Sequence, residues 1–131
     1  MLKDIIGKYY FEQNYNCAET IVRAANDEYH LGLTEEAIRM CGGFGGGMGC
    51  GKACGALCGG ICVISSKLIE NCAHETPELR QACQKLVSAF NRILGDTECK
   101  HLMMKYKKPD TRCLDTVLLG CEALESVMEQ D

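Results

Sequence analysis

Cysteine is the residue type in this chain best suited to redox or metal chemistry, and there are 11 cysteines among 131 residues. Four of them recur at intervals of four residues, at Cys50, Cys54, Cys58 and Cys62. Residues four apart lie on one face of an α-helix, so this spacing predicts a row of sulfurs along a helix. The same stretch is rich in glycine, which allows backbone segments to approach closely. Thiols in such surroundings indicate a redox or metal centre, although tight packing alone also accounts for Cys58 and Cys62.

Three other cysteines fall in the first turn of a predicted helix. They are Cys17, Cys99 and Cys113, each following residues that commonly cap helices. Free N–H groups and the positive end of the helix dipole favour a thiolate at such a position. We therefore expect lowered pKa values here, in thiols able to bind a metal or attack a disulfide.

The remaining cysteines carry a weaker signal. Free cysteine behaves as a small buried hydrophobe, and packing in apolar helix stripes explains three of them. These are Cys41, Cys83 and Cys121, while Cys72 falls near a predicted helix end.

The length predicts one domain, residues 1–131, which does not need disulfides in order to fold. The first residues carry charges and do not form a secretion signal, and the longest uncharged apolar run, 53–66, is too short to cross a bilayer. We expect a cytoplasmic protein with reduced thiols.

The net charge of −4 comes without a basic stripe, which argues against nucleic acid as a partner. The short run of Lys105, Lys107 and Lys108 is interpreted as a solvated helix end.

Apolar periodicity predicts an all-α helical bundle with no strand. Asn16 and Glu19 form a capping-box pattern, and Thr34 and the Thr76–Pro77 pair mark further helix starts. The segment 53–64 is apolar on every side, which is typical of a helix enclosed by others. The expected helices are 2–13, one after Asn16, one after Thr34, 51–70, one from Thr76 to Gly95, 98–104, and one capped by Asp110 or Thr111.

The two long helices around the enclosed one have clear apolar stripes. One stripe runs from Leu79 through Val87 to Leu94, and the other from Leu114 to Met128. We expect both to face the enclosed helix. Gly51, Gly55 and Gly59 recur at four-residue intervals on it, which predicts a close helix contact within the chain or across a homodimer.

The segment Cys54-Gly55-Ala56-Leu57-Cys58-Gly59 resembles the CGAxxG motif of the C_GCAxxG_C_C family of redox-active proteins. The resemblance extends to Asn16-Cys17-Ala18-Glu19, the glycine loop 42–49, the segment 95–99, and Arg112-Cys113. It implies that four cysteines hold a cofactor or metal, namely Cys17, Cys54, Cys99 and Cys113. A related domain in split-Soret-type cytochromes holds an iron–sulfur centre. This chain lacks C-x-x-C-H, so covalent haem is not expected.

Three functions remain open from the sequence. The first is a two-iron or four-iron cluster for electron transfer or redox sensing, since four thiolates are the usual ligands. The second is a thiol–disulfide oxidoreductase, and the third is a zinc or other soft-metal module. Cys50 and Cys58 are possible additional ligands, and His101 could donate a hydrogen bond near the centre. A redox partner protein is expected, and the resemblance points to a membrane transporter system; no hydrolytic enzyme is indicated.

Overall fold

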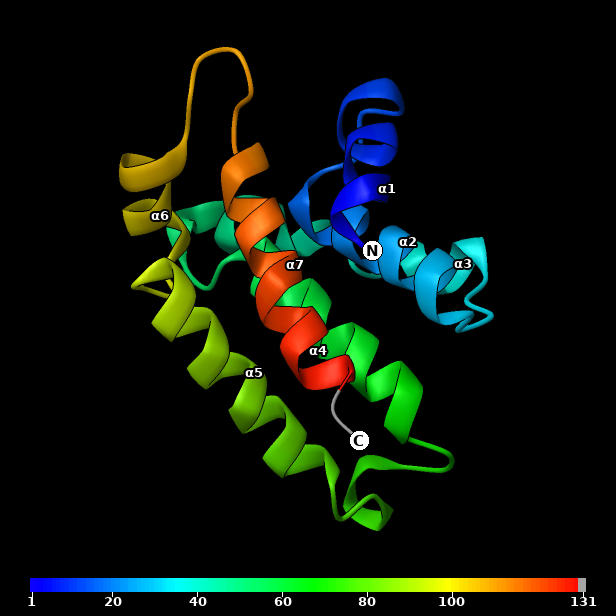
Figure 1. The fold of residues 1–131 in the computed structure, drawn as a ribbon. Coiled ribbons are helices and arrows are strands. Elements are labelled where there is room, and N and C mark those ends of the chain that lie inside the picture. Colours follow the sequence, from blue (N-terminus) through cyan, green and yellow to red (C-terminus); the bar gives the residue numbers. More distant parts are fainter. Residues whose placement is uncertain (130–131) are drawn as a thin grey trace.

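The computed structural model describes residues 1–129 and is all-α, as predicted (Figure 1). Within these residues there are seven α-helices, four short 3₁₀ or π turns, and no strand beyond two isolated bridges. None of these helices has both the length and the apolar character needed to cross a membrane. The elements are α1 (Lys3–Gly7), η1 (Lys8–Glu12), α2 (Cys17–Tyr29), α3 (Glu35–Arg39), η2 (Gly42–Phe44), η3 (Gly47–Gly51), α4 (Gly55–Leu68), η4 (Ala73–Glu75), α5 (Leu79–Leu94), α6 (Cys99–Tyr106) and α7 (Leu114–Met128).

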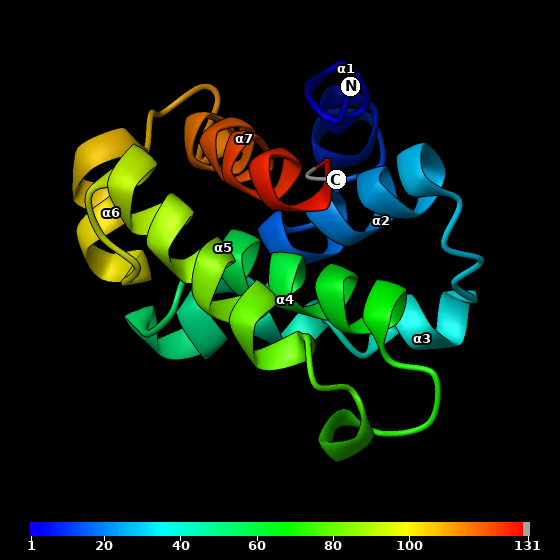
Figure 2. The same cartoon turned by 60° about the horizontal axis from the view of Figure 1, so that its bottom comes forward.

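Helix α4 is the enclosed helix that the sequence predicts. It packs against α2, α5 and α7, and these neighbours surround it in both views (Figure 1, Figure 2). Its side chains Val63 and Ile64 are almost fully buried. Burial of such aliphatic side chains contributes about 1.5–3 kcal/mol each, so the packing around α4 stabilises the bundle.

Glycines let the neighbouring helices come close to α4. A Cβ atom on Gly59 would lie 2.9 Å from the carbonyl oxygen of Ala18 and would collide with Ile21, both in α2. On the next face, a Cβ atom on Gly60 would lie 2.9 Å from Cδ2 of Leu86 in α5. The close helix contact predicted from the glycine spacing therefore occurs within the chain at Gly55 and Gly59, whereas Gly51 lies before the start of α4.

The stripes on α5 and α7 face inward for most of their length. In α5, Leu86, Phe90 and Leu94 are buried, and in α7 Val117, Cys121, Leu124 and Met128 are buried. Val87 was expected in the inner stripe, but it is 41% exposed. It lies one residue beyond Leu86, about 100° around the helix, and so leaves the buried face.

Helix boundaries differ from the sequence prediction where glycine and turn residues intervene. Helix α4 begins at Gly55 and not near Gly51, because Met48, Gly49 and Gly51 adopt left-handed backbone conformations, with φ of 62°, 72° and 75°. Cys50 is consequently not on the helix, and the predicted row of four sulfurs is wrong at this position. The predicted first helix passes into a π-helical turn at Lys8.

Two predicted caps are also wrong. The hydroxyl of Thr76 donates to the carbonyl of Cys72, at 2.8 Å, and Glu78 occupies the N-cap of α5. The last helix begins at Leu114, after a turn that carries Asp110 and Thr111 outside it. Both starts therefore fall two or more residues later than the capping residues suggest.

The contact at Gly59 gives a stability prediction. Gly59→Ala should lower the free energy of unfolding by about 1–3 kcal/mol, because the added methyl group overpacks the contact with α2. Gly7→Ala is the matched control, since a Cβ atom there meets nothing within 4 Å. Its helical position should make that change neutral or stabilising, by up to about 1 kcal/mol. Urea denaturation of both variants measures the difference, and equal stabilities would contradict the close contact.

Candidate redox site at four helix starts

The four cysteines implied by the family resemblance line one cavity. Its volume is about 150 Å³, and the sulfur-bearing residues Cys17, Cys54, Cys99 and Cys113 all contribute to its wall. The other lining residues are Gly46, Leu102, Met103, Lys107 and Thr116. Residues separated by almost a hundred positions in sequence thus meet around one small space.

Each of these cysteines stands at the beginning of a helix. Cys17 and Cys99 are the first residues of α2 and α6, while Cys54 and Cys113 are the N-cap residues of α4 and α7. The sequence predicted this position for three of them and missed Cys54, because the start of α4 was placed too early. The positive ends of four helix dipoles therefore lie around the cavity, which favours negative charge within it.

The start of α2 is fixed by a complete capping box. The side chain of Asn16 accepts a hydrogen bond from the Glu19 amide at 3.0 Å, and the Glu19 carboxylate accepts one from the Asn16 amide at 3.1 Å. The Asn16 amide group also donates to the carbonyl of Gly42, at 2.9 Å. One side chain thus positions Cys17 and ties the glycine loop to the same helix end.

A short antiparallel bridge holds the starts of α4 and α6 together. Ala53 pairs with Glu98, the Cys54 amide donates to the Thr97 carbonyl at 2.8 Å, and the Cys99 amide donates to the Lys52 carbonyl at 2.6 Å. Two cysteines that are far apart in sequence consequently lie on adjacent backbone segments.

The carboxylate of Asp96 braces the turn before α6. It accepts hydrogen bonds from the Thr97 and Glu98 amides, at 2.7 and 3.0 Å. Its second oxygen lies 2.7 Å from Nδ1 of the exposed His101. His101 is engaged with Asp96 and does not line the cavity, in contrast to the suggested donor role.

Cys113 is positioned from the N-terminal segment. Its amide donates to the hydroxyl of Tyr10, at 3.0 Å. The preceding residue, Arg112, pairs with Lys108 in a tight hairpin and places its guanidinium over the Tyr10 ring, 4.6 Å from the centroid. The π-helical turn that carries Tyr10 therefore supports the fourth cysteine.

Glycine is required where the loop and α4 meet these thiols. A Cβ atom on Gly47 would lie 2.6 Å from Cβ of Cys99 and 2.7 Å from the Lys52 amide nitrogen. A Cβ atom on Gly55 would lie 2.5 Å from Sγ of Cys17. The space that larger residues would fill is thus occupied by backbone and by cysteine side chains.

Burial raises the pKa of all four thiols, which overturns the expectation of lowered values. For Cys17, burial is the largest effect; amide hydrogen bonds from Gly46 and Ala18 oppose it, and the neighbouring Cys113 and Cys99 thiols add to it. Burial raises the pKa of Cys54 to about 12. For Cys99 and Cys113 burial is again the largest cause of the raised pKa, and the positive charge of Lys107 opposes it. Without a bound cation, these thiols therefore stay protonated at neutral pH.

Two further lining residues are suited to an anionic occupant. Thr116 is 4% exposed, and its hydroxyl has no hydrogen-bond partner among residues 1–129, which is unusual for a buried polar group. Lys107, interpreted from the sequence as part of a solvated helix end, is exposed but also lines the cavity. None of the described residues that line the cavity carries a carboxylate. Four cysteine thiols, the Thr116 hydroxyl and the Lys107 ammonium thus fit a negatively charged thiolate centre.

The four thiols share the cavity without forming a ready-made site for a single metal ion. Among residues 1–129, no three His, Cys, Asp or Glu side chains are close enough to hold one metal ion. A tetrahedral zinc site needs sulfurs about 4 Å apart, since each Zn–S bond is about 2.3 Å.

The two additional ligand candidates do not line the cavity. Cys50 is exposed, with its thiol 3.7 Å from the Gly47 carbonyl. Cys58 is half-buried on α4, where burial raises its pKa and the thiols of Cys62 and Cys17 add to the effect. Both remain predictions as ligands.

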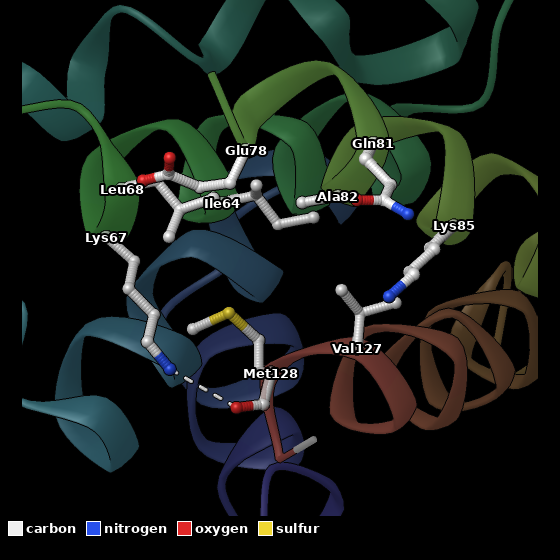
Figure 3. Close-up of a pocket in the computed structure, with 9 residues that line it drawn as sticks. All are labelled: Ile64, Lys67, Leu68, Glu78, Gln81, Ala82, Lys85, Val127 and Met128. Carbon is white, nitrogen blue, oxygen red and sulfur yellow. Dashed lines mark hydrogen bonds between the residues drawn. The ribbon is translucent and has the colours of Figure 1, made fainter. Parts of the chain in front are cut away.

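A larger hollow between α4, α5 and α7 contains no thiol (Figure 3). Its volume is about 300 Å³, with an apolar floor that includes Ile64 and Met128. The Lys67 ammonium donates to the Met128 carbonyl at its edge, at 3.2 Å. None of the residues that line this hollow is redox-active, so it is not a candidate redox site.

An all-α fold that gathers cysteines from four helix starts defines the broad class as a cysteine-rich helical domain. The chain belongs to the C_GCAxxG_C_C family, whose model is described as "Putative redox-active protein" and matches residues 15–127. That range includes all four cavity cysteines. No curated protein and no solved structure matches the sequence.

The raised thiol pKa values predict a loss of stability at alkaline pH. The folded state favours the protonated thiols, so the stabilisation is complete below the unfolded pKa of about 8.5 and is lost as the pH rises. For Cys54 the loss extends toward the folded pKa of about 12. Urea denaturation of the metal-free protein between pH 8 and about 10.5 should show this decline.

The Cys54→Ala variant tests whether the raised pKa of this thiol causes the loss of stability at alkaline pH. The variant should show a shallower decline with pH, while Cys72→Ser, at an exposed position, provides the matched control. A decline of equal steepness in the Cys54→Ala protein and the unaltered protein would contradict the role of this thiol.

Proposed function

We propose that the protein binds an iron–sulfur cluster through Cys17, Cys54, Cys99 and Cys113 and uses it in electron transfer or redox sensing. The observation that carries this proposal is the position of these thiols at four helix starts around one cavity of about 150 Å³. Four cysteine thiolates are the usual ligands of two-iron and four-iron clusters. A bound cluster would supply one-electron chemistry that the side chains lack.

The spacing of the thiols favours a cluster over a single zinc ion. A zinc ion would require all four sulfurs to close around one centre, whereas different irons of a cluster bind different cysteines. The residues in 1–129 form no ready-made site for one ion, which argues against zinc and leaves the cluster as the proposed occupant.

The protonation state of the thiols argues against the oxidoreductase alternative at this cavity. A nucleophilic cysteine works as the thiolate, and such residues have lowered pKa values in positively charged, accessible surroundings. Here burial raises the pKa of each thiol, and Cys54 and Cys99 are only 3% and 7% exposed. Metal binding can displace the protons, because the metal–thiolate bonds supply the compensating energy.

The other lining residues have separate roles in this proposal. Leu102 and Met103 exclude water from one side of the cavity. Lys107 lowers the energy of the neighbouring thiolates, since its charge opposes the burial effect at Cys99 and Cys113. The unpaired Thr116 hydroxyl can donate to a sulfur atom. Residues of this kind orient metal ligands and tune reduction potentials.

The partner in this proposal is a redox protein in the cytoplasm, with a membrane transporter system as the candidate that the family resemblance suggests. Nucleic acid is not the proposed partner, since the chain carries a net charge of −4. An electron donor or acceptor would approach near the exposed Lys107, where the cavity wall reaches the surface.

Anaerobic reconstitution tests the proposal. Protein reduced and incubated with iron and sulfide should become brown and retain iron and sulfide in comparable amounts after gel filtration. Cys17→Ser, Cys54→Ser, Cys99→Ser and Cys113→Ser should each lose most of the bound iron, because a ligand is removed. Cys83→Ser is the matched control, as this half-buried cysteine lies on α5 away from the cavity.

Two outcomes would contradict the cluster. Zinc bound tightly by the anaerobic protein, with no iron retained, would support the metal-module alternative. Equal iron in the unaltered protein and in the four variants would exclude these thiols as its ligands.

Thr116 provides a test of cluster tuning. Thr116→Val keeps the shape of the side chain but removes the hydroxyl, whereas Thr116→Ser keeps the hydroxyl. A hydrogen bond to sulfur stabilises the more negative reduced state, so its loss should lower the potential by about 30–60 mV, from roughly 1 kcal/mol. Electrochemistry of the reconstituted variants measures the shift, and an unchanged potential in Thr116→Val would contradict the contact.

A further inference from the structure

Basic residues gather in one part of the molecule, around helix α6, which contributes part of the wall of the cysteine cavity. Residues 99–113 carry five of the 14 basic residues of the chain and one of its 18 acidic residues. This segment is therefore positive, although the whole chain has a net charge of −4. A solvated helix end, the interpretation of these lysines from the sequence, does not account for such a separation of charge.

Two segments of the chain place basic residues side by side here. A Cβ atom on Gly51 would lie 3.1 Å from Cβ of Lys100, and the Lys52 carbonyl accepts the Cys99 amide at 2.6 Å. Lys52 and Lys100 therefore extend from adjacent backbone segments, and both are exposed. Lys107 is exposed at the end of α6. We call Lys52, Lys100 and Lys107 the basic surface.

The charges of the basic surface are not neutralised by neighbouring carboxylates. Within residues 1–129, none of its three ammonium groups forms an ion pair, whereas the next residue, Lys108, pairs with Asp115 at 2.7 Å. Helix α6 itself contains no acidic residue. Clustered charges of one sign attract ligands of the opposite sign, and salt weakens this attraction.

The basic surface lies where the cavity reaches the solvent. Lys107 and Gly46 line the cavity, and both are exposed. Two methionines on the neighbouring elements are exposed as well, Met104 of α6 by 88% and Met48 of η3 by 50%. Exposed methionine is typical of protein contact surfaces, and charges at the rim of an interface steer its formation. These features indicate a surface for a protein partner.

We propose that the basic surface is the docking site of an acidic one-electron carrier protein. The inference rests on the proposed function, because a bound cluster is the centre that takes up or releases the electron. One electron passes between the two centres and no bond is made or broken: the carrier is oxidised as the cluster is reduced, or the reverse. A carrier docked here lies beside the cavity wall at Lys107, and therefore close to the cluster.

The distribution of charge favours a small acidic protein over an anionic membrane. Outside residues 99–113 the chain carries nine basic and 17 acidic residues. A membrane extends beyond the basic surface and meets this negative remainder, which it repels. A compact carrier contacts the basic surface alone. The separation of charge also orients the chain as the carrier approaches, which raises the association rate.

Titration of the full chain with an acidic carrier tests the proposal. The anaerobically reduced protein, with and without reconstituted iron, is titrated with oxidised plant-type ferredoxin in a calorimeter. Binding should weaken about 10-fold or more between about 20 mM and about 500 mM NaCl, because the Debye length falls from about 20 Å to about 4 Å. Cytochrome c, a basic carrier, is the comparison. Tighter binding of cytochrome c than of ferredoxin at low salt would overturn the choice of an acidic partner.

Matched double variants locate the docking site. Lys52→Gln with Lys100→Gln should weaken ferredoxin binding about 3- to 10-fold at low salt, since two charges leave the basic surface. Arg39→Gln with Arg80→Gln removes two exposed charges from α3 and from the first turn of α5. Both places lie away from α6 (Figure 1, Figure 2), so this control should change binding by less than about 2-fold.

Three outcomes would overturn the docking site. They are the absence of ferredoxin binding, equal binding by the two double variants, and binding that high salt leaves unchanged. Phosphatidylglycerol vesicles provide the membrane comparison. Cosedimentation with these vesicles that is lost in the Lys52→Gln, Lys100→Gln variant, without ferredoxin binding, would assign the basic surface to a membrane.

Iron analysis keeps this test separate from that of the cluster. Neither Lys52 nor Lys100 lines the cavity, so their double variant should retain as much iron as the unaltered protein. A chain that binds ferredoxin but retains no iron would contradict the cluster alone. A chain that retains iron but does not bind ferredoxin would contradict the docking site alone.

Discussion

The close approach of α2 to α4 is the constraint on which the rest of the structure depends. At Gly55 and Gly59 α4 presents no side chain to α2, and a Cβ atom on Gly55 would lie 2.5 Å from Sγ of Cys17. This contact brings the beginnings of α2 and α4 side by side. The bridge between Ala53 and Glu98 then adds the beginning of α6, and Tyr10 fixes the amide of Cys113 at the beginning of α7. A residue larger than glycine at this contact would separate Cys17 from Cys54.

The electrostatics of the cavity combine two opposing effects. Helix dipoles, the Gly46 and Ala18 amides and Lys107 favour negative charge, while burial and the mutual repulsion of the thiolates oppose it. Burial prevails in the metal-free protein, and the thiols remain protonated. In the proposed cluster, bound cations would reverse the balance, because their positive charge would offset the repulsion and the helix ends would stabilise the remaining negative charge.

Features that depend on local patterns were predictable from the sequence. The capping box at Asn16, the apolar stripes of α5 and α7 and the enclosed character of α4 follow from residue periodicity, and all are present. The start of α4 was not predictable in this way, because Met48 adopts a left-handed conformation that nothing in its residue type suggests. The raised pKa of Cys54 also escaped prediction, since burial arises from packing between distant elements. Thr116 gave no signal, as a threonine in the first turn of a helix is common.

The placement of the four cavity cysteines in distant parts of the sequence has a kinetic consequence. Cys17 and Cys113 are separated by most of the chain, so the cavity is completed only when the last helix has docked. Contacts of this sequence separation form late, after local helices and neighbouring pairs. During synthesis, an incomplete chain that ends before α7 lacks one wall of the cavity and cannot enclose a ligand there. A ligand that binds only the completed cavity would therefore load after the chain has folded, and it would shift the equilibrium toward the folded chain.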